Sequence, residues 1–140
     1  MQTPSVHGSA GTRRILIVDD DKGVSDVLSR LIERLLPDCR VETAVDGLAA
    51  ETHIAAFRPG LVITDLAMPN RNGAELCRWI RGNGFAATKV LVLTSNPYCE
   101  LLGAAMVAGA DAWLAKPPKI LELLARVDEL MAGVAPSREN

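Results

Sequence analysis

The 140-residue sequence lacks several features that would each point to a particular class of protein. No apolar run is long enough to cross a bilayer, and residues 1–13 are small and polar, unlike the basic and then apolar start of a secretory signal. The formal net charge is only −2, without the concentrated basic patch of nucleic-acid-binding proteins. We therefore expect a cytoplasmic protein that binds neither membrane nor nucleic acid.

Cysteine is scarce, and its pattern excludes a disulfide framework or a thiolate metal site. Cys39, Cys77 and Cys99 are odd in number and lack metal-ligand spacing, which favours reduced thiols. There is also no repeat, no low-complexity segment and no linker, and the length suits one domain. We predict a disordered tail at 1–12, a folded domain at 13–134 and a polar C-terminal tail at 135–140.

Apolar residues make up 49% of the chain, and they form five short runs that alternate with helical patterns. The predicted strands are 14–18, 40–44, 61–64, 90–93 and 112–115. The fourth helix is expected to start at Asn96 and Pro97, as cap and first helical residue, and to stop at Gly109. All strands except the mixed 40–44 read as covered on both faces. Right-handed crossovers then favour a doubly wound α/β sandwich.

Polar residues follow four of these apolar runs. Asp19 to Asp21 follow the first strand, Asp65 the third, Thr94 the fourth and Lys116 the fifth. In an open parallel sheet, this carboxyl edge is where ligands bind. Carboxylates, a hydroxyl and an ammonium group gathered there suit a divalent cation and a phosphoryl group.

Each of these residues also has a plainer interpretation. Asp19 and Asp20 alone would read as caps of the following helix, Asp65 as a turn residue, Thr94 as a β-branched strand end and Lys116 as a surface lysine. These interpretations do not explain why all fall at matching strand ends. Mg²⁺ would relieve the repulsion among clustered carboxylates. Asp65 is the best nucleophile candidate, because a carboxylate can form an aspartyl phosphate.

Four segments together resemble a response-regulator receiver domain, the phosphoacceptor module of two-component signalling. They are 15–21 (Ile-Leu-Ile-Val-Asp-Asp-Asp), 65–73 (Asp-Leu-Ala-Met-Pro-Asn-Arg-Asn-Gly), 90–95 (Val-Leu-Val-Leu-Thr-Ser) and 109–117 (Gly-Ala-Asp-Ala-Trp-Leu-Ala-Lys-Pro). The likeness covers residues 13–133. It implies a flavodoxin-like fold, in which five helices sandwich a five-stranded parallel sheet of order 2-1-3-4-5.

The resemblance also implies a role for each site residue. Asp65 would accept a phosphoryl group from a sensor histidine kinase or a histidine phosphotransfer protein. Asp20, Asp65 and the backbone carbonyl of Ala67 would hold Mg²⁺, with Asp19 close by through water. Thr94 and Lys116 would contact the phosphoryl group.

The resemblance further implies a switch made of Thr94 and Trp113, although the family more often has Tyr or Phe at the second position. It also suggests that the Lys116-Pro117 bond is cis. In the predicted helix 97–109 the only charged side chain is Glu100, so some apolar side chains must face solvent. Those spread around it are Tyr98, Leu101, Leu102, Met106 and Val107. With Trp113 and the last helix they would form an output surface for an effector protein or a second copy of the chain.

The sequence past the last helix is too short for a helix-turn-helix, so we expect the output in another molecule, unless this is a piece of a longer protein. Two other functions stay open. A phosphohydrolase of the haloacid-dehalogenase type would need a second Asp where Ala67 stands. A receiver that serves only as a protein-binding scaffold would not need Asp65, Thr94 and Lys116 together. The favoured function is a phosphoacceptor and not an enzyme.

Overall fold

The computed structural model describes residues 12–132, and apart from Thr12 the predicted tails lie outside this range. Five strands alternate with five helices along these residues. The strands are β1 (Arg13–Val18), β2 (Cys39–Ala44), β3 (Leu61–Asp65), β4 (Lys89–Thr94) and β5 (Ala112–Ala115). The helices are α2 (Lys22–Leu35), α3 (Gly47–Phe57), α4 (Gly73–Gly82), α5 (Glu100–Ala108) and α6 (Ile120–Met131).

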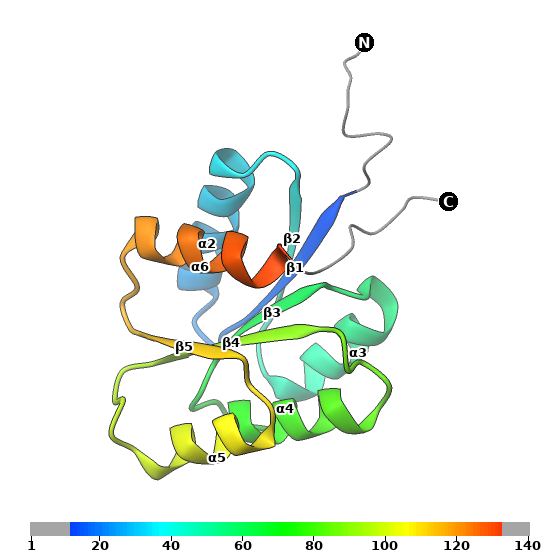
Figure 1. Ribbon diagram of the computed structural model, residues 1–140, viewed down its shortest axis with the longest axis vertical. Helices are drawn as coiled ribbons and strands as arrows, with labels where there is room; N and C mark the ends of the chain where they lie inside the picture. Colours follow the sequence, from blue (N-terminus) through cyan, green and yellow to red (C-terminus); the bar gives the residue numbers. More distant parts are fainter. Residues whose placement is uncertain (1–11, 133–140) are drawn as a thin grey trace.

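The strands form one parallel sheet of order β2-β1-β3-β4-β5, which confirms the predicted doubly wound fold. Figure 1 shows α2 and α6 on one face of this sheet and α3, α4 and α5 on the other. The chain moves from β1 outward to β2 and then returns past β1 to β3. The strand order therefore reverses between β1 and β3, and the carboxyl ends of these two strands flank the crevice where such sheets bind ligands.

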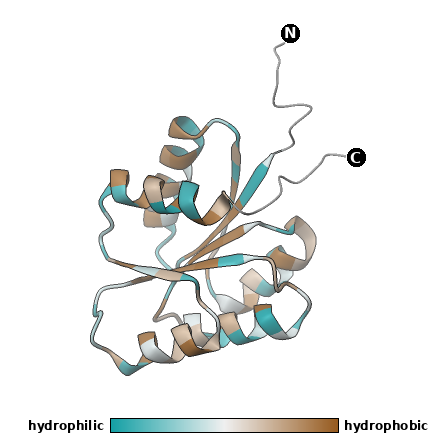
Figure 2. Ribbon diagram, viewed as in Figure 1, coloured by the Kyte–Doolittle hydropathy of each residue, from teal (hydrophilic) through white to brown (hydrophobic). Residues whose placement is uncertain are grey.

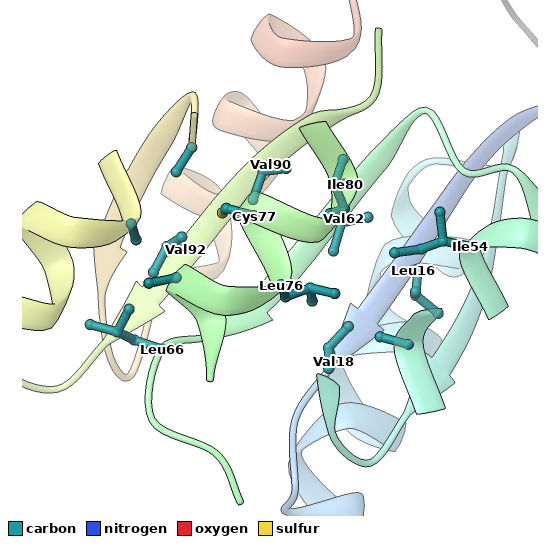
Figure 3. Close-up of a cluster of buried hydrophobic side chains, with 14 of the residues drawn as sticks. Leu16, Val18, Ile54, Val62, Leu66, Leu76, Cys77, Ile80, Val90 and Val92 are labelled. Atoms are coloured by element: carbon teal, nitrogen blue, oxygen red, sulfur yellow. The ribbon is translucent and has the colours of Figure 1, made fainter. Parts of the chain in front are cut away.

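Each face of the sheet carries its own buried core, and the period-two alternation of strand side chains divides the apolar residues between them. One core joins the sheet to α3, α4 and α5, with side chains that include Leu16, Val62, Val90, Ile54, Leu76 and Ile80; Figure 3 shows it. The other joins the sheet to α2 and α6, with side chains that include Ile17, Ile63, Leu91, Ile32, Leu123 and Val127. Figure 2 shows the central strands as largely hydrophobic, as expected for a sheet covered on both faces.

The helix starts differ from two sequence-based expectations. Asp21, and neither Asp19 nor Asp20, caps α2 by accepting a hydrogen bond from the Val24 N–H. The start predicted for the fourth helix is wrong, since α5 begins at Glu100 after a cap without a side-chain hydrogen bond. Asn96 instead accepts a hydrogen bond from the N–H of Tyr98, two residues on. This local turn competes with helix formation.

The apolar stripe of α2 is less buried than its spacing predicts, whereas the apolar residues of α5 divide between the surface and the core. On α2, Ile32 is buried, whereas Val24 and Val27 remain 36% and 55% exposed. Around α5, Tyr98 and Val107 are exposed as expected, but Leu102 is buried. The helical spacing alone could not distinguish these cases, because all six residues are apolar. No helix within residues 12–132 is long and apolar enough to span a bilayer.

Candidate functional site

Three carboxylates meet at the carboxyl ends of β1 and β3. Val18 pairs with Thr64 in the sheet, so Asp19 and Asp20 follow β1 beside Asp65, the last residue of β3. One oxygen from each carboxylate lies within 4.8 Å of the other two. Asp19 is buried and Asp20 is exposed, so the group is open to solvent on one side. This set of hard oxygen donors fits Mg²⁺, which prefers carboxylates and retains water.

Lys116 reaches the same point from the end of β5. Its Nζ lies 3.2 Å from Oδ2 of Asp19 and 3.3 Å from Oδ2 of Asp65. Its backbone N–H donates to the Thr94 carbonyl, and the Lys116-Pro117 peptide bond is cis. One ammonium group therefore bridges the carboxylates of two strands.

The pKa values of Asp65 and Lys116 reflect this crowding. Burial raises the pKa of Asp65 above its usual range, and the charge of Asp19 adds to the rise, while Lys116 opposes it. For Lys116, burial alone would lower the pKa, but the charges and hydrogen bonds of Asp65 and Asp19 outweigh burial and raise it. Ionised Asp65 is thus only partly compensated, which favours the approach of a further cation.

The β3–α4 loop, residues 66–72, carries Asp65 into the site. Oδ1 of Asp65 accepts a hydrogen bond from the Leu66 N–H at 3.0 Å, and the Leu66 carbonyl accepts one from Gly73 at 2.8 Å. A Cβ at Gly73 would lie only 2.9 Å from the Asp65 carbonyl oxygen, so glycine is required for this close turn. Ala67 lies at the exposed start of the loop, beside Asp65.

Thr94 lies near Asp65 but directs its hydroxyl elsewhere. Thr94 and Asp65 line the same cavity, of about 240 Å³. The Thr94 hydroxyl donates to the Asn96 carbonyl and accepts from the Asn96 N–H, both at 3.1 Å. A contact between Thr94 and a phosphoryl group therefore requires the hydroxyl to leave Asn96, and it stays a prediction.

A larger cleft of about 840 Å³ opens beside the carboxylates on the α2 side. Its polar lining comes from Asp21, Asp65, Ser95 and Lys116, and Ala67 lies beside them. Apolar side chains line the rest, from Val24, Val27, Leu28, Pro117 and Pro118. This explains the exposed valines of α2, since they border the site and do not enter the core.

Trp113 lies on β5, an edge strand of the sheet, and is 40% exposed. Its strand neighbour Leu114 belongs to the core under α2 and α6. Since side chains alternate along a strand, Trp113 projects to the α5 side. Trp113 is therefore on the side of the sheet that α5 covers.

The sequence did not predict a functional role for four residues at the β3–α4 loop. Two of them belong to the loop and the other two contact it. Asn70 donates a hydrogen bond to Oδ2 of Asp46 at 2.7 Å, and Arg71 forms an ion pair with Glu51. Asn70 and Arg71 lie in the segment that carried the family resemblance, but no local pattern shows that their partners lie on α3. Both contacts connect parts of the chain about 20 residues apart.

Comparisons with known proteins agree with this geometry. The family model described as response regulator receiver domain matches residues 15–128. The chain is 40% identical over 123 residues to response regulator MprA of Mycobacterium tuberculosis. This match covers 88% of this chain and 52% of MprA. The chain thus spans about half the length of the curated relatives it matches.

Two solved structures illustrate the likeness in three dimensions. The signal receiver domain of a response regulator from Bermanella marisrubri is 34% identical, with a TM-score of 0.76 over 86% of this chain and 98% of that one. Chemotaxis protein CheY4 of Vibrio cholerae is 27% identical, with a TM-score of 0.79 over 86% and 99%. With the family model matched over most of its length, the chain belongs to the response regulator receiver domain family of two-component signalling.

Proposed function

We propose that this receiver accepts a phosphoryl group on Asp65 from a phosphohistidine of a sensor histidine kinase or histidine phosphotransfer protein. The observation that carries the proposal is the placement of Asp65 within 3.3 Å of the Lys116 ammonium and beside two more carboxylates. An oxygen of Asp65 would attack phosphorus, so that a P–O bond forms as the P–N bond breaks. The imidazole leaves with the electron pair and then takes up a proton.

The chain supplies the groups that this transfer needs. Asp20, Asp65 and the carbonyl of Ala67 would hold Mg²⁺, with Asp19 next to them through water; the bound cation would neutralise charge between the carboxylate and the phosphoryl group. Lys116 would pair with a phosphoryl oxygen as a point charge. Thr94 would donate its hydroxyl once released from Asn96. These roles involve positioning and charge neutralisation, which dominate phosphoryl transfer.

The apolar cleft beside Asp65 supports docking of the phosphate donor. Val24, Val27 and Pro118 give it apolar walls next to the acceptor carboxylate. A donor helix placed there would bring its phosphohistidine to Asp65 and exclude water from the transfer. We place the protein in the cytoplasm, where such donors act, and propose that it is a phosphoacceptor without catalytic turnover of its own.

The test is to incubate the protein with acetyl phosphate and Mg²⁺ and to measure its intact mass. We expect the gain of one phosphoryl group, absent without Mg²⁺ and absent in Asp65→Asn. An unchanged mass of the wild type would overturn the proposal, and so would equal labelling of Asp65→Asn. Continuous release of phosphate from a generic phosphate ester would instead favour a hydrolase.

We also propose an output face made of α5, β5 and α6, which would act on an effector protein in trans or on a second copy. Tyr98 and Val107 are 93% and 90% exposed, and Trp113, 40% exposed, projects from β5 to the side of the sheet that α5 covers. Movement of Thr94 toward a phosphorylated Asp65 would free space along β4 and let Trp113 reorient, a small shift between two packed states. Binding of nucleic acid is not part of this proposal.

We expect phosphorylation to change the fluorescence of Trp113, measured with Trp79 replaced by Phe. Thr94→Ala should abolish the change while Asp65 is still labelled, because the hydroxyl that links the two sites is gone. Val107→Lys should weaken effector binding or self-association without affecting labelling. An unchanged signal on phosphorylation, with normal association of Val107→Lys, would place the output surface elsewhere.

A further inference from the structure

The tip of the β3–α4 loop is fastened to the first turn of α3, a helix that supplies none of the expected metal or phosphoryl contacts. Asn70, with a left-handed φ of 68°, donates its side-chain amide to Oδ2 of Asp46 at 2.7 Å. The other oxygen of Asp46 accepts the Ala49 N–H at 2.8 Å and caps α3. One carboxylate thus caps the helix and holds the loop.

A second connection lies one turn further along α3. Nε of Arg71 forms an ion pair with Oε2 of Glu51, and both atoms are shielded from solvent. The two backbones also meet there, since a Cβ at Gly47 would lie 2.5 Å from the Arg71 carbonyl oxygen. Shielding strengthens a charge pair and makes the loss of either partner costly. Moving the loop tip away from α3 would therefore break both connections.

These connections bear on the site because the loop is held at both ends. Its base is fixed by the hydrogen bond from Gly73 to the Leu66 carbonyl, and its tip by Asn70 and Arg71. Ala67 lies between the two. Mg²⁺ demands near-octahedral geometry, so a small displacement of a backbone ligand weakens its binding. An anchored loop would present that ligand without reorganisation.

We propose that Asp46 and Glu51 of α3 are positioning residues for the cation site, which hold the loop through Asn70 and Arg71 so that the backbone at Ala67 keeps its place beside Asp65. This inference rests on the proposed function. It makes α3 a support of the site, although no atom of α3 is expected to touch the cation or the phosphoryl group.

The ion pair allows a test that separates positioning from charge. Glu51→Gln removes a negative charge, and Arg71→Gln removes a positive one, so long-range electrostatics alone would weaken Mg²⁺ binding in the first and strengthen it in the second. A displaced loop would weaken binding in both. We expect both variants to bind Mg²⁺ about ten-fold more weakly by isothermal titration calorimetry. The charge swap Glu51→Arg with Arg71→Glu should recover most of the affinity.

Two further variants complete the design. Arg126→Gln breaks an ion pair with Glu129 on the surface of α6 and should leave Mg²⁺ affinity unchanged. Asn70→Ala tests the other connection without changing any charge, and should also weaken Mg²⁺ binding. The labelling rates of Glu51→Gln, Arg71→Gln and Asn70→Ala with acetyl phosphate should fall at low Mg²⁺ and recover at saturating Mg²⁺, whereas the rate of Arg126→Gln should stay that of the wild type.

The outcomes distinguish this inference from the proposed function. A wild type that takes up neither Mg²⁺ nor a phosphoryl group overturns the proposed function and this inference with it. A wild type that is labelled normally, with Arg71→Gln binding Mg²⁺ as tightly or more tightly, overturns this inference alone. The same holds if the variants lose only thermal stability, measured without Mg²⁺, while their affinity stays that of the wild type.

Discussion

Asp20→Ala is expected to lose Mg²⁺ binding and to slow phosphorylation from acetyl phosphate by about 100-fold, the usual scale for removing one electrostatic partner of a transition state. Asp20 is the exposed member of the three carboxylates, so it meets the cation first and its removal does not disturb the core. Without it, the anionic Asp65 must meet an anionic phosphoryl group with only Lys116 to offset the repulsion.

Although Asp20→Ala should impair Mg²⁺ binding and phosphorylation, it should not reduce the stability of the protein when Mg²⁺ is absent. Three carboxylates with oxygens within 4.8 Å repel one another, so Asp20→Ala should unfold at an equal or higher denaturant concentration than the wild type. Added Mg²⁺ at 100 times its Kd should stabilise the wild type by about 2.7 kcal/mol and leave the variant unchanged. Urea titrations with and without Mg²⁺ measure both effects.

Asp21→Ala is the matched control, because it removes the same charge one residue further on. Asp21 caps α2, so its loss should cost about 1 kcal/mol of stability while the response to Mg²⁺ remains. Equal labelling of wild type and Asp20→Ala, or a loss of the Mg²⁺ response in Asp21→Ala alone, would contradict the assignment of Asp20.

Lys116→Gln is expected to destabilise the protein by about 2 kcal/mol at neutral pH without Mg²⁺, because it leaves two shielded carboxylates without their cation. Lys116 Nζ lies 3.2 Å and 3.3 Å from Asp19 and Asp65, whose side chains are 4% and 14% exposed. Mg²⁺ should reduce the difference in stability between the wild type and Lys116→Gln, since it supplies positive charge at the same point. Labelling of Asp65 should also slow.

The pH dependence of the stability lost in Lys116→Gln follows from the raised pKa values of Asp65 and Lys116. The raised pKa of Asp65, caused first by burial, means that its ionised form opposes folding, so its favourable contribution exists in acid and is lost as pH rises through the folded-state value. The pKa of Lys116 is raised by Asp65 and Asp19 against the effect of burial, so its stabilisation persists to alkaline pH. The penalty for Lys116→Gln should thus shrink as pH falls and Asp65 is protonated.

Chemical denaturation of the wild type and Lys116→Gln at pH 4 and pH 7 checks this expectation. Lys119→Gln, which removes an exposed lysine three residues on, serves as the control and should change stability little at either pH. A penalty of equal size at both pH values would contradict the expectation that ionised Asp65 makes Lys116 necessary.

The order of strands and helices could be predicted from the sequence because it depends on local periodicity. Nearly continuous apolar runs such as the first three residues of β3, Leu61 to Ile63, favour strands covered on both faces, and their alternation with helical patterns favours a parallel sheet with helices on each side. The strand-end positions of Asp19, Asp65 and Lys116 then determine which side chains meet. That meeting was predicted, and the carboxylate and ammonium groups do lie together.

Only the tertiary structure decided which of several equivalent polar or apolar residues performs each structural task. Asp21 caps α2, whereas Asp19 and Asp20 do not. Val24 and Val27 border the cleft, while Ile32 enters the core. The hydroxyl of Thr94 donates to the Asn96 carbonyl. Neighbouring residues of one chemical type have the same local preferences, so their exact orientation relative to the sheet selects among them.

The anchoring of the β3–α4 loop to α3 could not be predicted from local sequence pattern either. Asn70 and Arg71 are ordinary turn and surface residues by local pattern, and Asp46 reads only as a helix cap. Their pairing depends on how closely α3 approaches the loop after the sheet has formed. The sequence by itself determined the alternation of strands and helices and the chemical groups of the site, because both follow from local period and strand-end position. The supports of that site come from long-range contacts between polar side chains, which have no period to reveal them.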